Sequence, residues 1–162
     1  MDRYVRQLGI RQLGEQGQKR LLESTVLVVG AGGLGSVALY CLSGAGVGHI
    51  RLADGDTVSC SNLNRQFLHF EKDIGRGKVE SASEKLSAFA PQLDLQPYHG
   101  FVDETNAEPL VRGADAVLAA TDNVSSRLAL NRACCRLGVP LVNGGIDGMM
   151  ANRWTSGISA SG

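Results

Sequence analysis

The 162 residues carry 16 basic and 16 acidic side chains, so the formal net charge at pH 7 is zero. This balance gives no electrostatic reason to expect nucleic acid or an anionic membrane as a partner. No run approaches 18 consecutive apolar residues, and the first residues lack the pattern of a signal peptide. We therefore expect a cytoplasmic protein with one main domain.

The predicted elements of the first half alternate between helices and strands. Residues 1–23 are expected to be helical, and the β-branched run at 25–29 predicts a strand buried on both faces of a parallel sheet. A helix is expected over residues 33–43, with Gly44 as its stop and one face made of Leu34, Val37, Ala38 and Cys41. Residues 50–53 form the second predicted strand.

The second half continues the alternation. Helices are expected over residues 78–89, around 104–111, and from a cap at Asn123 or Ser125 to residue 137. Strands are expected at 94–98, 116–120 and 140–143, followed by a turn at Gly144 and Gly145. This order predicts a doubly wound α/β domain with a Rossmann-like, mostly parallel sheet and helices on both faces. Residues 151–162 are expected to form a loose tail, because they show little periodicity.

The carboxyl ends of three predicted strands carry residues typical of nucleotide sites. The loop Gly30-Ala-Gly-Gly-Leu-Gly35 follows the first strand, and Asp54 ends the second strand some twenty residues later. This is the layout of a mononucleotide-binding β-α-β unit, in which the acid binds a ribose hydroxyl. Asp122 follows the fourth strand, and ligands in such folds bind where these strand ends meet.

Polar side chains directly after Asp54 favour a triphosphate over a dinucleotide. The Arg65 guanidinium has five donors suited to phosphate oxygens, and Asn62 and Gln66 add neutral hydrogen bonds. Lys78 begins a helix after a glycine-rich turn and can reach the same crevice. We therefore predict ATP, with Arg65 and Lys78 on its phosphates.

In this hypothesis Asp122 holds Mg²⁺, a cation that prefers carboxylate and phosphate oxygens. Each of these residues also has a structural alternative. Lys78 can be solvated at a helix start, Asp122 can cap a helix, and Arg65 can form a surface ion pair of small energy. The sequence leaves the role of Asp56 undecided.

The chain resembles the amino-terminal part of the MoeB/ThiF/HesA family, adenylyltransferases related to ubiquitin-activating enzymes. The resemblance covers residues 1 to about 150 and rests on five motifs in the family's order and spacing: Arg3-Tyr-Val-Arg6-Gln, the glycine loop, Asp54-x-Asp-x-Val-x-x-Ser-Asn-Leu-x-Arg-Gln66, Ile74-Gly-x-x-Lys78 and Asp122-Asn-x-x-x-Arg127.

The resemblance implies adenylation of the C-terminal glycine carboxylate of a ubiquitin-like sulfur-carrier protein ending in Gly-Gly, with release of pyrophosphate. It implies four catalytic residues: Arg6, Arg65, Lys78 and Asp122. It also implies a set of nucleotide-binding residues: Gly30, Gly32, Gly33, Gly35, Asp54, Asp56, Ser61, Asn62, Arg65, Gln66 and Lys78. Family members are typically homodimers in which the residue matching Arg6 reaches the partner's ATP site; a solvated helix face is the alternative for Arg6.

The sequence departs from the family at its carboxyl end. Residues 1–150 match the ATP-binding adenylation domain, whereas family members continue beyond it and often carry two Cys-x-x-Cys pairs for zinc. The four cysteines here form no such pair, so the chain offers no zinc ligands. They are expected to be reduced thiols, and the three histidines are assigned no role: His49, His69 and His99.

Two other functions compete with an adenylyltransferase. The first is a nucleotide-binding or dimerising scaffold that lost turnover together with its carboxyl half. The second is an NAD-dependent oxidoreductase on the same fold, which leaves Arg65, Lys78 and Asp122 unexplained.

Overall fold

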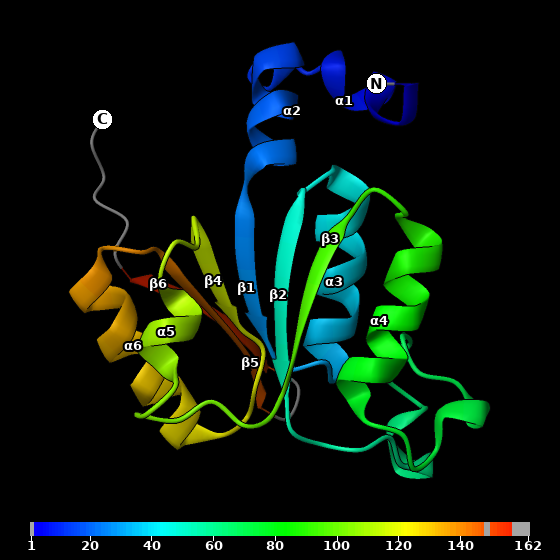
Figure 1. Ribbon diagram of the computed structural model, residues 1–162, viewed down its shortest axis with the longest axis vertical. Helices are drawn as coiled ribbons and strands as arrows, with labels where there is room; N and C mark the ends of the chain where they lie inside the picture. The colour runs from blue at the N-terminus through cyan, green and yellow to red at the C-terminus, as the bar shows by residue number, and fades with distance from the viewer. Residues whose placement is uncertain (1, 148–149, 157–162) are drawn as a thin grey trace.

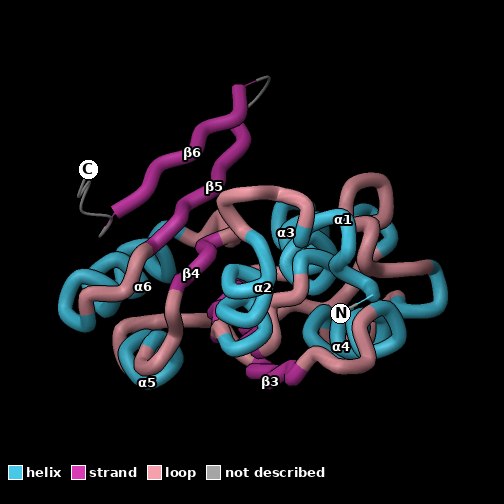
Figure 2. The backbone as a smooth tube through the Cα atoms, turned by 90° about the horizontal axis from the view of Figure 1, so that it is seen from above, coloured by secondary structure: helices cyan, strands magenta, loops and turns pink. Residues whose placement is uncertain are grey.

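A six-stranded sheet with helices on both faces forms the body of the protein (Figures 1 and 2). The computed structural model describes residues 2–147 and 150–156. The strand order is β3-β2-β1-β4-β5-β6, and β1 to β5 are parallel whereas β6 is antiparallel to β5. The strands have these bounds: β1 Thr25–Val29, β2 His49–Asp54, β3 Asp94–His99, β4 Ala116–Ala119, β5 Leu141–Asp147 and β6 Met150–Ser156. The predicted doubly wound α/β fold is confirmed.

Strand β1 lies at the centre of the sheet, where both of its faces are buried. Leu27 and Val29 pack in one apolar cluster with residues of α5 (Ala107–Val111) and α6 (Val124–Leu137). Val26 and Val28 pack in the other cluster, with residues of α3 (Gly33–Ala45) and α4 (Lys78–Phe89). Successive side chains of a strand point to opposite faces, so a strand covered on both sides needs a continuous apolar run.

Helix α3 is two residues longer than predicted. Gly44 lies within the helix, and the stop is Gly46, which has a φ of 89° and takes the left-handed conformation at the helix end. The face predicted from Leu34, Val37, Ala38 and Cys41 is turned largely outward: Val37 is 50% exposed, Leu34 and Cys41 are exposed, and Ala38 is half-buried. The opposite, buried face consists of small residues and one leucine: Gly35, Ser36, Leu39 and Ser43.

The amino-terminal segment is helical, as predicted, but in three pieces: a 3-10 turn Asp2–Tyr4, α1 Val5–Leu8 and α2 Gly14–Glu23. Gln7 and Gln18 fasten it to the end of α3, since both side chains donate to the carbonyl of Ala45, at 2.9 and 3.0 Å. Figure 1 shows the segment at the amino-terminal ends of the strands. It therefore lies at the opposite end of the sheet from the glycine loop.

The carboxyl-terminal part differs from the sequence prediction. Strand β5 continues through Gly144 and Gly145, where a turn was expected, and β6 occupies residues 150–156, where a loose tail was expected. The two strands pair from Leu141↔Ser156 to Asp147↔Met150. Both expectations are therefore wrong for these residues, because backbone pairing holds a strand that lacks apolar alternation. Residues 157–162 lie outside the described part. Among the described residues, no helix is long and apolar enough to cross a membrane.

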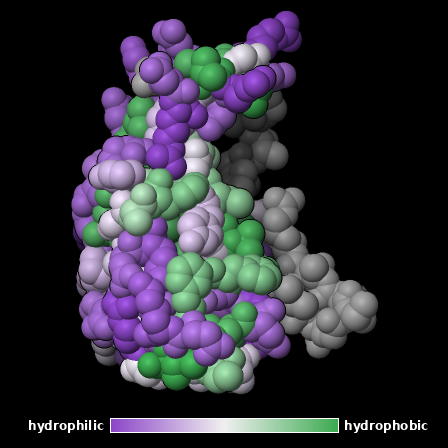
Figure 3. All heavy atoms as spheres, turned by 90° about the vertical axis from the view of Figure 1, so that its right-hand side faces the viewer, coloured by the Kyte–Doolittle hydropathy of each residue, from purple (hydrophilic) through white to green (hydrophobic). Residues whose placement is uncertain are grey.

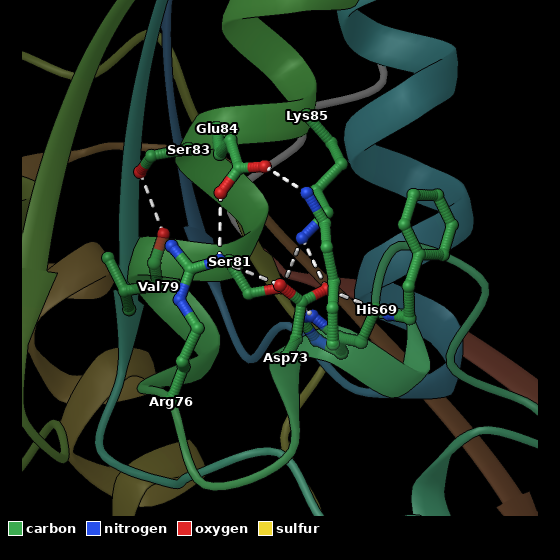
Figure 4. A network of polar contacts seen from close by, with 10 residues as sticks. His69, Asp73, Arg76, Val79, Ser81, Ser83, Glu84 and Lys85 are labelled. Carbon is green, nitrogen blue, oxygen red and sulfur yellow. Dashed lines mark hydrogen bonds and ion pairs between the residues drawn. The ribbon is translucent and has the colours of Figure 1, made fainter.

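A buried ion pair fastens the connection between β2 and α4 (Figure 4). Asp73, at the end of the 3-10 turn Glu71–Asp73, is fully buried and contacts the ammonium group of Lys85 on α4. It also accepts hydrogen bonds from Arg76 Nη1 and the Phe70 N–H, both at 2.8 Å. Burial alone would raise the pKa of Asp73, but the Lys85 ammonium, the Phe70 N–H and the Ser81 hydroxyl outweigh it and lower the pKa from 3.8 to about 2.

Replacing Asp73 with asparagine is expected to lower the free energy of unfolding by about 3 kcal/mol at neutral pH, because Lys85 would keep a buried charge without its partner. Because the pKa of Asp73 is lower in the folded than in the unfolded protein, its ionised form stabilises the fold at pH values above the unfolded pKa. This stabilisation is lost as the pH falls towards the folded pKa. Urea denaturation should therefore show the gap between wild type and variant closing as the pH falls from about 5 to about 2.

Glu84→Gln is the matched control, since Glu84 is an exposed member of the same network and contacts Lys72 and Arg76. Its loss should be clearly smaller than that of Asp73→Asn. Equal losses for the two variants at neutral pH would contradict the importance of the buried pair.

Candidate functional site

A cleft of about 660 Å³ opens at the carboxyl ends of the parallel strands. Its walls come from the residues that follow β1, β2, β3 and β4, together with Gly144 and Gly145 of β5. Helix α3, which follows β1, packs on one face of the sheet, whereas α6, which follows β4, packs on the other face. The loops after these two neighbouring strands therefore turn away from each other. Ligands of doubly wound folds bind at this kind of switch point.

The glycine loop forms the floor of the cleft. Gly30, Gly32 and Gly33 line it, and Gly30 has a φ of 101°. A Cβ atom at Gly30 would lie 2.7 Å from the carbonyl oxygen of Ala120, after β4. Gly35 does not line the cleft; a methyl group there would overlap the carbonyl oxygen of Gly30. Gly35 thus lets α3 start directly against the loop.

Asp54 ends β2 and holds the backbone around the cleft. Its Oδ2 accepts the Ala31 N–H at 2.7 Å, and its Oδ1 accepts the Asp56 N–H at 2.8 Å. Each carboxylate oxygen keeps a second lone pair. The half-buried carboxylate can therefore still accept hydrogen bonds from a ligand hydroxyl.

Lys78 is the first residue of α4 and lines the cleft with a side chain that is only 8% exposed. Its Nζ lies 2.8 Å from Asp56 Oδ2, and its N–H donates to the Asp56 carbonyl at 2.9 Å. Asp56 is more than half exposed. Asp56, whose role the sequence leaves undecided, thus holds a largely buried ammonium at the wall of the cleft.

Arg65 and Gln66 line the cleft from the segment between β2 and α4. Gln66 is buried, and its Oε1 has no hydrogen-bond partner within the described residues. A buried polar atom without a partner is costly, so it marks a place where a ligand or water completes the structure. Arg65 is exposed and donates from Nη1 to the Ser61 carbonyl and to Asn64, both at 3.0 Å.

Besides Gly35, two residues of the predicted nucleotide set do not line this cleft, namely Ser61 and Asn62. Asn62 Oδ1 accepts the Ser59 N–H at 3.1 Å and closes the 3-10 turn Cys60–Asn62. The carbonyl of Ser61 orients Arg65. These contacts shape the loop that carries Arg65.

Asp122 follows β4, is exposed and lines the cleft. The next helix is capped by Asn123, whose Oδ1 accepts the Ser126 N–H at 3.1 Å, so the cap predicted at Asn123 or Ser125 is Asn123. The described residues contain no cluster of three or more acidic, histidine or cysteine side chains suited to a metal. A lone carboxylate beside a cleft suits Mg²⁺, which usually takes one or two carboxylates and completes its shell with phosphate oxygens and water.

Arg6 lies in α1, at the other end of the sheet, and is exposed. The structure therefore does not bring it to the cleft of its own chain.

Among the lining residues that the sequence did not predict, two have side chains that bear on the shape of the site, Arg127 and Phe101. Arg127 donates from Nε to the Thr121 carbonyl at 2.7 Å and from Nη2 to the Gly144 carbonyl at 2.6 Å, so it ties the ends of β4 and β5 together. Phe101 is 58% exposed and packs against the backbone of Gly55, next to Asp54. Arg127 belongs to the motif that runs from Asp122 to Arg127, four residues after Asn123. No local sequence pattern indicates Phe101.

The sequence matches the ThiF family over residues 4–157. The chain belongs to this family. It is 42% identical over 146 residues to the SAMP-activating enzyme E1 of Haloferax volcanii, covering 90% of this chain and 54% of that protein. It is 44% identical to the molybdopterin-synthase adenylyltransferase of Escherichia coli strain K12, covering 89% of this chain and 58% of that protein.

A solved structure of the E. coli tRNA N6-threonylcarbamoyladenosine dehydratase in complex with ATP has a similar fold. The TM-score is 0.83 at 31% identity, covering 93% of this chain and 63% of that one. The chain thus spans a little over half the length of these two curated relatives.

The loop geometry predicts opposite effects for two alanine substitutions in α3. Gly35→Ala is expected to lower the free energy of unfolding by about 2 kcal/mol, because the methyl group meets a backbone oxygen that must move. At Gly44 a Cβ atom would lie 3.7 Å from the Phe89 ring, an ordinary contact. Gly44→Ala should therefore stabilise the helix by about 0.5 kcal/mol. Chemical denaturation measures both, and equal effects would contradict the close packing at Gly35.

Proposed function

We propose that the cleft binds Mg-ATP and that the protein adenylates the C-terminal glycine carboxylate of a ubiquitin-like sulfur-carrier protein. The observation that carries this proposal is that one cleft combines the side chains of Lys78 and Arg65, the glycine loop, and the carboxylates of Asp54 and Asp122. The glycine loop follows β1, which lies between β2 and β4 in the sheet; Asp54 ends β2 and Asp122 follows β4. A ribose beside Asp54 and a triphosphate over the glycine loop, within reach of the two cations, match this arrangement.

The individual groups of ATP fit the lining. Asp54 suits a ribose hydroxyl, and the exposed ring of Phe101 beside it offers an apolar surface to the base. Phosphates fit over Gly32 and Gly33, where side chains are absent, with Lys78 within reach. The Gln66 amide, with its unpartnered Oε1, is available to the nucleotide.

The relatives support the type of reaction. The names of two of them, molybdopterin-synthase adenylyltransferase and SAMP-activating enzyme E1, describe adenylation and the activation of a small protein. A similar fold is solved with ATP. A carrier ending in Gly-Gly presents a free carboxylate on a flexible, narrow chain that can enter the cleft.

The reaction brings two anions together. A carboxylate oxygen of the carrier forms a bond to the α-phosphorus, and the bond from that phosphorus to the oxygen bridging to the β-phosphate breaks, which releases pyrophosphate. Lys78 and Arg65 would neutralise charge on the phosphates and align them for in-line attack. Mg²⁺, held by Asp122 and phosphate oxygens, would supply further charge neutralisation when bound.

The proposal extends to a homodimer in which Arg6 acts across the interface. Arg6 is exposed and remote from the cleft of its own chain, as a residue serving a partner would be. The outward face of α3 exposes Leu34 and Val37 near the loop, and Figure 3 shows apolar surface among polar residues on the side of α4. Apolar surface of this kind favours association, and two-fold symmetry makes the contact reciprocal.

Exchange of radiolabelled pyrophosphate into ATP, with and without a carrier ending in Gly-Gly, tests the activity. Arg65→Ala and Lys78→Ala should each reduce exchange roughly 10²–10³-fold, the usual effect of removing one charge-stabilising donor. Asp122→Ala should lose activity in a way that depends on Mg²⁺ concentration. Lys72→Ala is the control, because Lys72 is 60% exposed and does not line the cleft.

Near-normal exchange in all three cleft variants would place the site elsewhere. Binding of ATP by the wild type without any exchange would favour the competing function, a nucleotide-binding scaffold.

Mixing two inactive variants tests the dimer. Arg6→Ala and Lys78→Ala homodimers should both be weak, since each of their sites lacks one cation. A mixed dimer should regain one intact site, with Arg6 from one chain and Lys78 from the other. If subunits exchange and activity does not return, Arg6 is a solvated helix residue.

A further inference from the structure

A row of buried polar groups connects the glycine loop to helix α4 (Figure 4). His69 is 3% exposed and stands in the middle of it. Its Nε2 lies 2.9 Å from the Ala31 carbonyl oxygen, and its Nδ1 lies 2.9 Å from Ser81 Oγ. Lys85 Nζ lies 2.9 Å from the same Ser81 oxygen and pairs with Asp73. His69 was assigned no role from the sequence, and its side chain does not line the cleft.

The partners of His69 show which of its two ring nitrogens carries a proton. A carbonyl oxygen only accepts hydrogen bonds, so Nε2 must carry the proton and donate it to Ala31. Nδ1 of a neutral ring is then an acceptor, and the Ser81 hydroxyl donates to it. The Ser81 oxygen in turn accepts from the Lys85 ammonium. With His69 neutral, every group in the row has a complementary partner.

Ala31 is the residue that this row holds. It lies between Gly30 and Gly32, is fully buried, and has both of its backbone groups occupied. Its N–H donates to Asp54 and its carbonyl accepts from His69, so the loop is clamped from two sides. The hydroxyl of Ser36 adds a longer contact of 3.3 Å to the same carbonyl. The clamp sets where the adjacent glycines of the cleft floor lie.

The charges around His69 also disfavour its protonation. Burial lowers its pKa most; the Ala31 carbonyl acts in the opposite direction, Lys78 and Lys85 of α4 lower the pKa further, and Asp73 raises it slightly. The net pKa is below 6.5. Among the charged groups that face the ring, two cations on α4 thus oppose one carboxylate of the preceding turn.

We propose that His69, in its neutral form with the proton on Nε2, is a positioning residue that holds the glycine loop in the shape that binds the triphosphate. Protonation places a second N–H against Ser81, whose hydroxyl hydrogen must turn away, and adds a third positive charge beside Lys78 and Lys85. The Ala31 hydrogen bond by itself favours the charged ring, but burial and the two lysines outweigh it. Protonation therefore favours a state in which the clamp on Ala31 is loosened, and nucleotide binding weakens. This inference rests on the proposed binding of ATP.

A positioning role for His69 and direct contact with the phosphates predict opposite changes in ATP affinity as the pH falls. A protonated histidine that touched the phosphates would strengthen the binding of an anionic nucleotide as the pH falls. A histidine that positions the loop from behind weakens it. The pH dependence therefore separates the two roles.

Two amide substitutions separate the two ends of the imidazole. The amide nitrogen of glutamine reaches the place of Nε2, and the amide of asparagine reaches only the place of Nδ1. His69→Gln keeps a donor for Ala31 but cannot take up a proton, whereas His69→Asn keeps the Ser81 contact and leaves the Ala31 carbonyl unpaired. Calorimetric titration with Mg-ATP between about pH 5 and pH 8 compares both with the wild type.

At pH 8, His69→Gln should bind ATP within about threefold of the wild type, and His69→Asn about tenfold more weakly. As the pH falls, the affinity of the wild type for ATP should fall more steeply than the affinity of His69→Gln. The variant has no imidazole at this position, so its pH profile shows the effect of protonating ATP itself. Nitrogen-15 NMR of the imidazoles should show one buried ring, His69, that carries its proton on Nε2 and resists protonation as the pH falls. Circular dichroism with thermal unfolding checks that both variants are folded at the titration temperature.

Equal affinities of the two folded variants, or parallel pH profiles for wild type and His69→Gln, would overturn the positioning role while leaving ATP binding intact. If the wild type does not bind ATP at any pH, the proposed function fails and this role fails with it. A proton on Nδ1 rather than Nε2 in the NMR spectrum would overturn the assignment independently of any nucleotide.

Discussion

The structure depends on the close approach of two backbones at the switch point of the sheet. The loop after β1 passes so near the residue after β4 that a side chain at Gly30 would meet the Ala120 carbonyl oxygen. This approach is possible because β1 and β4 are neighbours and their chains turn away to opposite faces. With no side chain at Gly30, Gly32 or Gly33, the space between them stays open and forms the floor of the cleft. The cleft thus follows from topology and glycine placement together.

Around this floor, charged groups are held by contacts that are separate from any ligand. Asp54 is held by two backbone N–H groups, Lys78 by Asp56, and Arg65 by the turn that precedes it. Because these side chains are already ordered, few of them lose conformational freedom when a ligand binds, and the entropic cost of binding is lower. The Asp73–Lys85 pair extends this order behind the cleft, where it anchors α4 and the segment that carries Gln66 and His69.

Much of the fold could be predicted from the sequence because its signals are local. The β-branched run of β1 and the spacing from the glycine loop to Asp54 fix the first β-α-β unit. Strand β6 was missed because an antiparallel edge strand is held by backbone pairing to β5, which leaves no apolar period to detect. The exposed face of α3 was misleading for a related reason: close packing on the loop selects small residues on the buried side, so the larger ones face outward.

The residues of the site likewise divide into those with a local sequence signal and those placed by tertiary packing. Residues that stand in motifs at a strand end or a helix start, such as Asp54, Lys78 and Asp122, line the cleft as their spacing indicated. The contacts of His69 join residues 38 and 12 positions away, and Phe101 reaches the cleft from a loop after β3. No local pattern encodes these approaches, since one depends on how the connection between β2 and α4 folds back and the other on the course of the loop after β3. Their roles toward a ligand remain predictions.

The central claim is that the cleft is built for a triphosphate and not for a dinucleotide. Calorimetric titration of the same protein sample with Mg-ATP and with NAD tests it most directly. The account predicts measurable binding of ATP and none of NAD, because Lys78 and Arg65 need phosphate charge and NAD carries less of it. Tighter binding of NAD than of ATP would contradict the account.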